Sequence, residues 1–280
     1  YTCGIEEPNA LVQVLNENNE PNVRATVKKI YDGMVLKSQN RWPSLKSDIG
    51  SINNLLSPIF SAGFYYKTFM GPKGFWKNVY EPIIRRTAGL GKPPREFKSK
   101  STHLNHNVDF LIVGGGLSGL LAAKKLAGTN YDVLLVERDA DLGGILKNSK
   151  KIKLIDGQKP NDWIEKTEWL LKSANNIKIL KNTTVTTYNY KNHLIAVEDK
   201  YVGKSPDDNK PELVLHKIRT DHTVLANGHI ERFLSFRNND LPGVMLAASF
   251  EKYIHRYGVV ADKSPVIFTN NSSTFSLIKT

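Results

Sequence analysis

A glycine-rich turn between a predicted strand and a predicted helix constrains this chain more than any other feature. Residues 108–113, VDFLIV, form a mostly apolar, branched run that is typical of a buried strand in a parallel sheet. Gly114, Gly116 and Gly119 follow with GxGxxG spacing, and residues 120–127 have helical spacing. The first glycine permits a tight bend, the second lets the backbone approach a pyrophosphate, and the third lets helix and strand pack closely. The helix N-terminus then favours the negative charge of a phosphate.

A second predicted strand supplies the context that a lone GxGxxG lacks. Residues 132–136 follow the helix and lead into Glu137, 18 residues after Gly119. A carboxylate at this spacing accepts hydrogen bonds from a ribose diol. A tight turn without a ligand is the plain alternative, but the whole constellation favours a dinucleotide site. Glu137 favours a free ribose 2′-hydroxyl, whereas the neighbouring Arg138 leaves a phosphorylated ribose open.

Length, composition and charge limit the class of protein. With 280 residues, the chain is long enough for two domains, and its 40% hydrophobic and 24% charged content is ordinary for a globular protein. No apolar run reaches the roughly 18–20 residues that span a bilayer, and no basic, apolar leader begins the chain. We therefore expect a cytoplasmic protein with no membrane contact. The net charge of +12 comes from scattered lysines, and no recognition motif predicts a nucleic-acid partner.

The sequence shows no residue pattern that is typical of a metal site or a catalytic centre. Cys3 is the single cysteine, so these residues hold no internal disulfide, no CxxC pair and no cysteine-rich zinc or iron–sulfur site. His103 and His106 fall in the polar run 98–107, which we interpret as a solvated linker, so no metal site is predicted. No spacing of Asp, Glu and His requires catalysis, so no catalytic residue is predicted.

Three parts are expected along the chain. Residues 1–100 hold short strands, an aromatic-rich helical segment that forms a core or a subunit contact, and a linker. Residues 101–240 hold the dinucleotide-binding domain. Residues 241–280 indicate the start of a second nucleotide-binding domain, with a strand at 265–268 whose following turn lacks glycine. Because the chain begins at Tyr1 and stops where a new helix is predicted, we expect a fragment of a longer polypeptide.

Further elements are predicted inside the central part. Gly143 and Gly144 let the backbone pass close to a dinucleotide, and an amphipathic helix covers 162–174. The remaining predictions are strands at 177–180 and 183–188, a hairpin of 193–197 with 212–218, and a returning strand at 223–226.

Several longer phrases carry a resemblance to a known family. They are GIEEPNALV at 4–12, SQNRWPSL at 38–45, AGFYYKTF at 62–69, YEPIIRR at 80–86 and NDLPGVM at 239–245. The predicted elements resemble flavoproteins of the glutathione-reductase type, and the phrases resemble the alpha subunits of heterotetrameric sarcosine oxidases. This resemblance implies an α/β, Rossmann-like FAD/NAD(P)-binding domain preceded by a small α+β ferredoxin-like module of the β-grasp type.

The same resemblance implies an activity that belongs to a larger assembly. It is a cytoplasmic complex of alpha, beta, gamma and delta subunits that oxidises sarcosine to glycine and hydrogen peroxide. The methyl carbon leaves as formaldehyde or as methylenetetrahydrofolate. FAD and FMN are implied on the beta subunit and at its boundary with the alpha subunit, and tetrahydrofolate in a C-terminal part outside these residues. NAD is implied in the alpha subunit without a hydride-transfer role, so this fragment alone is not expected to be catalytic.

The resemblance also assigns cofactor-binding positions. The positions that match the family's NAD site are Gly114, Gly116, Ser118, Gly119, Glu137, Arg138, Gly144 and Val185. Leu117-Ser118 stands where Pro-Ala is frequent, and Asn227 stands where Thr is usual.

Alternative functions stay open at this point. One is the alpha subunit of a related oxidase or dehydrogenase that acts on proline, opines or glycine. Another is a stand-alone NAD(P)H-dependent FAD reductase, against which the glycine-poor turn after residue 268 argues. A third is a scaffold whose nucleotide is purely structural. FAD in place of NAD in the first site also remains an alternative.

Overall fold

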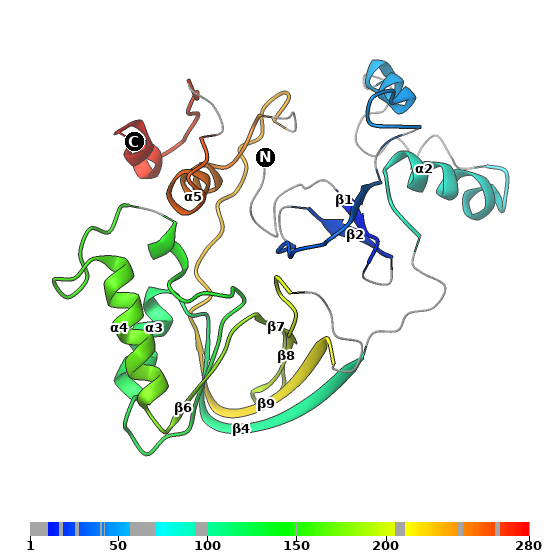
Figure 1. Ribbon diagram of the computed structural model, residues 1–280. Helices are drawn as coiled ribbons and strands as arrows, with labels where there is room; N and C mark the ends of the chain where they lie inside the picture. The colour runs from blue at the N-terminus through cyan, green and yellow to red at the C-terminus, as the bar shows by residue number, and fades with distance from the viewer. Residues whose placement is uncertain are drawn as a thin grey trace. The chain divides into compact units, whose positions relative to one another are not determined.

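The computed structural model describes residues 11–16, 19–25, 28–39, 41, 43–56, 71–92, 100–148, 150–204, 211–239, 243–260 and 264–279. The chain divides into two compact units (Figure 1). The smaller unit takes the described residues of 5–98 together with 203–204, and the larger unit takes those of 99–202 and 206–280.

The smaller unit contains a three-stranded antiparallel sheet in the order β2-β1-β3. Its strands are β1 (Leu11–Val14), β2 (Glu20–Arg24) and β3 (Leu36–Ser38). Strands β1 and β2 pair antiparallel, which confirms the short strands expected in this part of the chain. Gly33 has a φ of +79°, which a glycine adopts without strain, and it turns the chain toward β3.

The helical part of this unit follows the sheet in the sequence. It comprises the 3₁₀-helix η1 (Ile49–Leu56), the π-helical turn η2 (Trp76–Tyr80) and α2 (Glu81–Thr87). Pro82 lies in the first turn of α2, where the π-helical turn η2 passes into the α-helix. Phe75 and Trp76 are 43% and 46% exposed, so of the two interpretations of the aromatic stripe a buried core is wrong for these two side chains.

The larger unit is built on a six-stranded mixed sheet in the order β6-β5-β4-β9-β8-β7. The pairs β6–β5, β5–β4 and β4–β9 are parallel, and the pairs β9–β8 and β8–β7 are antiparallel. The strands are β4 (Ser101–Val113), β5 (Val133–Val136), β6 (Ile177–Leu180), β7 (Thr183–Asn189), β8 (His193–Asp199) and β9 (Leu213–Leu225).

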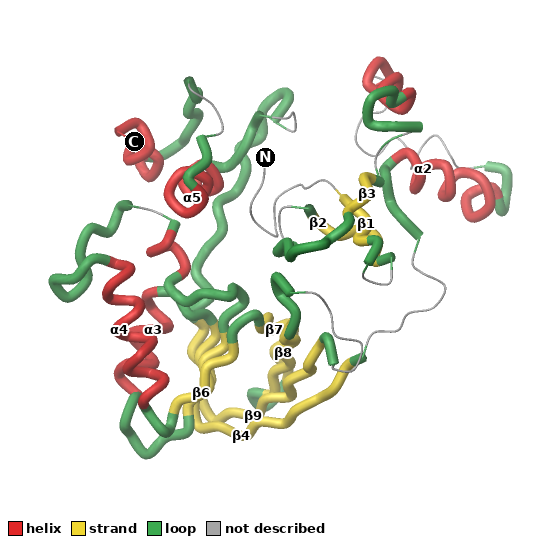
Figure 2. The backbone as a smooth tube through the Cα atoms, viewed as in Figure 1, coloured by secondary structure: helices red, strands yellow, loops and turns green. Residues whose placement is uncertain are grey.

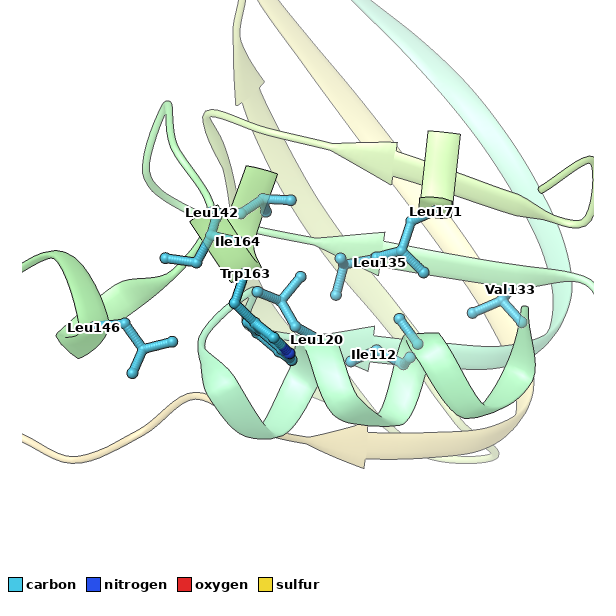
Figure 3. Close-up of a cluster of buried hydrophobic side chains, with 10 residues drawn as sticks. Ile112, Leu120, Val133, Leu135, Leu142, Leu146, Trp163, Ile164 and Leu171 are labelled. Atoms are coloured by element: carbon cyan, nitrogen blue, oxygen red, sulfur yellow. The ribbon is translucent and has the colours of Figure 1, made fainter. Parts of the chain in front are cut away.

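Two helices cover one face of this sheet. Helices α3 (Leu117–Leu126) and α4 (Pro160–Ser173) lie side by side in Figure 1, and they enclose a buried cluster with the strands (Figure 3). The cluster consists of Ile112, Leu120, Ala123, Val133, Leu135, Leu142, Leu146, Trp163, Ile164 and Leu171. Because strand side chains alternate, Leu111, Leu134 and Val136 pack into a second cluster with side chains of β8 and β9. Both faces of β5 and of the apolar half of β4 are therefore buried or partly buried, as the apolar run 108–113 predicts for β4.

The polar run before the glycine turn is not a linker, which corrects the prediction for residues 101–107. These residues form the first half of β4 and pair in parallel register with Leu213–Arg219 of β9. Figure 2 shows the two strands side by side over their whole length. Polar side chains are compatible with this strand because most of them are exposed there, while the ladder satisfies the backbone.

His106 is also not solvated in the way that a linker residue would be. Its Nε2 lies 2.8 Å from Nδ1 of His216, whose Nε2 lies 2.9 Å from a carboxylate oxygen of Glu198. His216 is 1% exposed. Burial, together with the nearby Lys178 and His216, lowers the pKa of His106 below its usual 6.5, although Glu198 acts in the opposite direction.

The remainder of the larger unit departs from the prediction in two places. Residues 212–218 and 223–226 were predicted as separate strands, whereas β9 runs without a break from Leu213 to Leu225. A predicted strand at 265–268 is wrong, because these residues form no strand, and Val266 is 95% exposed. Helix α5 (Ala247–Tyr257) precedes them and ends at Gly258 with a φ of +65°, and the 3₁₀-helix η4 (Ser272–Lys279) follows. Within the described part of the chain, no helix is long and apolar enough to cross a membrane.

Candidate dinucleotide site

The glycine turn joins β4 to α3 through a very close backbone approach. Gly114 has a φ of +104°, and its N–H donates to the carbonyl of Val136 at 2.8 Å. A Cβ on Gly119 would overlap the carbonyl oxygen of Gly114, so only glycine lets the helix start this near the strand. The first and third glycines therefore have the packing roles that the sequence predicted.

Gly116 is the N-cap of α3 and faces open space. A Cβ built on this residue would have no heavy atom within 4 Å, so the backbone here is accessible to a ligand. The first-turn amides of α3 have no acceptor within the helix, and they include that of the exposed Ser118. An open glycine next to free N–H groups is the arrangement that accommodates a pyrophosphate.

The carboxylate of Glu137 lies directly beside this turn. One oxygen accepts the N–H of Gly115 at 2.6 Å, and the other accepts the N–H of Asp139 at 2.8 Å. Each carboxylate oxygen can accept more than one hydrogen bond, so capacity for two ribose hydroxyls remains. The structure thus brings Glu137 and the glycine turn together, as the spacing along the chain predicted.

A second pair of glycines packs against the first. The N–H of Gly143 donates to the carbonyl of Gly115 at 2.8 Å, and a Cβ on Gly144 would lie 3.2 Å from Cα of Gly116. Both residues have positive φ, +114° and +50°, which favours glycine. Gly144 therefore adds a second bare stretch of backbone beside Gly116, and the residues present fit a dinucleotide.

Strand β7 begins next to the same carboxylate residue. The N–H of Thr183 donates to the carbonyl of Glu137 at 2.9 Å, which places Val185 two residues further along β7. Its pairing with β8 shifts register between Val185 and Thr187, so the backbone ladder is interrupted there. The side chain of Val185 is partly buried against the second apolar cluster, so its backbone is what the strand can offer to a ligand.

The end of β9 encloses the turn from the other side. The N–H of Ala226 donates to the carbonyl of Val113 at 2.8 Å, and a Cβ on Gly114 would overlap the carbonyl of Ala226. The exposed Asn227 therefore lies next to Gly114.

Comparisons with known proteins agree with this geometry. The family model of the NAD(P)-binding Rossmann-like domain matches residues 112–159, which confirms the predicted fold class. Sarcosine oxidase subunit alpha from Rhizobium meliloti (strain 1021) is 41% identical over 284 residues, covering 99% of this chain and 28% of that protein. The chain is similar to sarcosine oxidase alpha subunits along almost its whole length. This confirms the resemblance inferred from the sequence phrases.

One further relative and one solved structure are also similar to this chain. Sarcosine oxidase subunit alpha from Corynebacterium sp. (strain U-96) is 33% identical over 285 residues, covering 99% of this chain and 24% of that protein. The crystal structure of L-proline dehydrogenase from P. horikoshii gives a TM-score of 0.43 at 23% identity, covering 56% of this chain and 30% of that one. The chain spans about a quarter of the length of the two sarcosine oxidase alpha subunits.

This alpha-subunit-like chain contains an ionic cluster at the site that sequence reasoning missed. Asp139 and Asp141 follow Glu137, and the guanidinium of Arg256 from α5 lies 3.8 Å from the first and 3.3 Å from the second. Arg138, half exposed, also lies 3.8 Å from Asp139. No signal in the sequence connects Arg256 with residues more than a hundred positions earlier, because only the fold brings α5 to this segment.

Proposed function

We propose that this chain is the NAD-binding segment of the alpha subunit of a heterotetrameric sarcosine oxidase, and that the nucleotide has a structural role. The observation that carries the proposal is the carboxylate of Glu137, held against the N–H of Gly115 at 2.6 Å beside the open backbone of Gly116. A free ribose diol suits such a carboxylate, whereas a 2′-phosphate would meet its negative charge. Arg138 lies 3.8 Å from the carboxylate of Asp139, which supports NAD over its 2′-phosphorylated form.

Each proposed site residue has a defined task in this arrangement. Gly114 and Gly119 hold strand and helix close together, and the first turn of α3, including Ser118, presents its amides to the pyrophosphate. Gly116 and Gly144 leave room for the backbone to approach it. Glu137 binds the adenosine ribose, with Arg138 at its rim, and the backbone at Val185 lies where an adenine packs. NAD would supply a nicotinamide that can accept a hydride, but a structural role does not require hydride transfer.

The wider activity is proposed for the complete assembly. The alpha subunit would associate with beta, gamma and delta subunits in the cytoplasm, and sarcosine would be oxidised at flavin on the beta subunit. FAD and FMN would serve the complex, and tetrahydrofolate would bind the alpha subunit outside these residues. The names of the relatives, of which this chain spans about a quarter, support a sarcosine oxidase with an alpha subunit. The other subunits, the flavins and the folate are implied by the family resemblance.

Identification of the bound nucleotide tests the proposal directly. The intact complex is purified and denatured, and the released nucleotides are identified by chromatography and mass spectrometry. The expected result is one NAD per alpha chain in addition to the flavins. An alpha chain that carries FAD and no NAD would overturn the assignment.

Substitution of Glu137 separates nucleotide binding from turnover. Glu137→Ala should weaken NAD binding by roughly 10- to 100-fold, because charge-assisted hydrogen bonds to the ribose are lost. Sarcosine-dependent oxygen consumption at the flavin should be retained. Glu165→Ala, which removes an exposed carboxylate on α4, is the matched control. An equal loss of turnover in an assembled Glu137→Ala complex would contradict a purely structural nucleotide.

The substrate is tested separately by steady-state oxygen consumption with sarcosine, proline and glycine. Sarcosine should give the highest kcat/KM. A higher value with proline or glycine would move the complex to a related amine oxidase and leave the NAD site unaffected.

A further inference from the structure

Helix α5, orange in Figure 1, is connected by ion pairs to the segment that follows Glu137. The guanidinium of Arg256, near the end of α5, lies 3.3 Å from the carboxylate of Asp141 and 3.8 Å from that of Asp139. The Arg256 side chain is only 21% exposed. A planar guanidinium can address two carboxylates at once, which a single ammonium group does poorly.

The same segment is connected to the proposed nucleotide site on its other side. The N–H of Asp139 donates to the Glu137 carboxylate at 2.8 Å, and the N–H of Gly143 donates to the carbonyl of Gly115 at 2.8 Å. Asp139 and Asp141 therefore lie between α5 and the groups that would hold the ribose and pyrophosphate. A shift of this segment would move the Glu137 carboxylate and the second glycine pair together.

Charge gives a second reason for Arg256 to matter. Asp139 and Asp141 place two carboxylates within four residues of Glu137, next to a site for a doubly negative pyrophosphate. Lys147 lies 3.7 Å from Asp141 and Arg138 lies 3.8 Å from Asp139, but both are close to these carboxylates along the chain. Arg256, by contrast, joins these carboxylates to α5, an element more than a hundred residues further along the chain.

We propose that Arg256 is a positioning residue for the dinucleotide: by bridging Asp139 and Asp141 it fixes the segment 139–143, so that α5 and NAD affinity are coupled. The inference rests on the proposed NAD site and adds a residue that does not touch the nucleotide. Because coupling is reciprocal, NAD also stabilises the docking of α5.

Two substitutions distinguish positioning from simple electrostatics. Arg256→Gln removes the bridge and a positive charge, so both explanations expect weaker binding of an anionic nucleotide. Asp141→Asn removes a negative charge, so electrostatics alone expects tighter binding. Positioning expects weaker binding because half of the bridge is lost. The sign of the Asp141→Asn effect therefore decides between them.

The measurement is the dissociation constant of NAD in the full-length alpha subunit within its assembled, NAD-depleted complex. Arg256→Gln should weaken binding roughly fivefold and Asp141→Asn roughly twofold to threefold, as expected for loss of partly exposed ion pairs. Lys172→Gln removes a 2.8 Å ion pair with Glu168 on α4 and should leave NAD affinity unchanged. Unchanged affinity in Arg256→Gln, or tighter binding in Asp141→Asn, would overturn the proposal.

Hydrogen exchange provides a readout that a merely structural role would not change. NAD should slow amide exchange in residues 247–257 of the wild-type complex and should not do so in Arg256→Gln. Arg256→Lys keeps the positive charge but loses the planar guanidinium that contacts both Asp139 and Asp141. This variant should bind NAD with intermediate affinity, and full wild-type affinity would refute the proposed bridging role of Arg256. If Arg256→Gln does not assemble, Asp141→Asn carries the test. A wild-type complex that does not bind NAD refutes the proposed function, whereas wild-type binding with unaffected variants refutes only this inference.

Discussion

Residues 101–107 and residues 265–268 differ in what holds their backbone. The first segment, STHLNHN, is polar and largely exposed, yet every residue in it pairs with a residue of β9. The second, PVIF, is apolar, yet it forms no strand, and Val266 and Phe268 are 95% and 68% exposed. An ordered strand therefore depends on a neighbouring strand that shares its register, and apolar side chains cannot replace it.

The polar segment is also held by a side-chain contact between His106 and the buried His216, which in turn contacts Glu198. The Nε2 atom of His216 faces the Glu198 carboxylate, which can only accept, so this nitrogen carries a proton. Nδ1 of His216 lies 2.8 Å from Nε2 of His106, within hydrogen-bond distance. Lys200 completes the array 2.7 Å from the other oxygen of Glu198.

The largest expected effect comes from breaking the apolar half of β4. Leu111→Ala should lower the free energy of unfolding by about 2–5 kcal/mol, because Leu111 is fully buried and its loss leaves a cavity between the sheet and its second cluster. Urea denaturation measures the change.

Leu104→Ala in the polar half of the same strand is the matched control. Leu104 is 47% exposed, so its truncation should cost less than about 1 kcal/mol. Equal costs at both positions would contradict burial of the side chain as the cause of the difference.

A smaller effect is expected from the histidine pair. His106→Leu should cost about 1–2 kcal/mol near neutral pH, because Nδ1 of the buried His216 loses its hydrogen-bond partner. The substitution should also change the pH dependence. The folded state lowers the pKa of His106, mainly by burial, so the unfolded chain binds the proton first as the pH falls.

The sign of the pH effect follows from this order of protonation. The stability that a neutral His106 provides is fully present above the unfolded value of 6.5 and is lost as the pH falls through the lower folded pKa. Urea midpoints from pH 8 to pH 5 should therefore fall less steeply in His106→Leu than in the wild type. His103→Leu, an exposed histidine on the same strand, is the control. Parallel pH profiles for His106→Leu and the wild type would contradict the lowered pKa.

The glycine turn and its neighbours were predictable because their constraints are local. GxGxxG spacing, the apolar run before it and the carboxylate 18 residues later each reflect short-range geometry, and the structure brings Glu137 to Gly115 accordingly. The amphipathic helix was predictable for the same reason, since Trp163, Ile164 and Leu171 share one face and are buried.

The rest depends on contacts between distant residues. The pairing of 101–107 with β9 joins residues more than a hundred positions apart. The polar composition of 101–107 alone is typical of a linker. Arg256 reaches Asp141 across a similar separation. Neither partner modifies the local pattern of the other, so neither contact leaves a signal in a single sequence.

The smallest effect on stability is expected in the apolar segment, residues 265–268. Val266→Ser should change the free energy of unfolding of a protein of these 280 residues by less than about 0.5 kcal/mol, because a side chain that is 95% exposed has almost no burial to lose. If residues 265–268 formed a strand buried on both faces, the same substitution would cost several-fold more. Urea denaturation in parallel with Leu111→Ala gives the contrast directly. A cost approaching that of Leu111→Ala would mean that the side chain of Val266 is buried. The contrast between a paired polar segment, 101–107, and an exposed apolar segment, 265–268, would then be wrong.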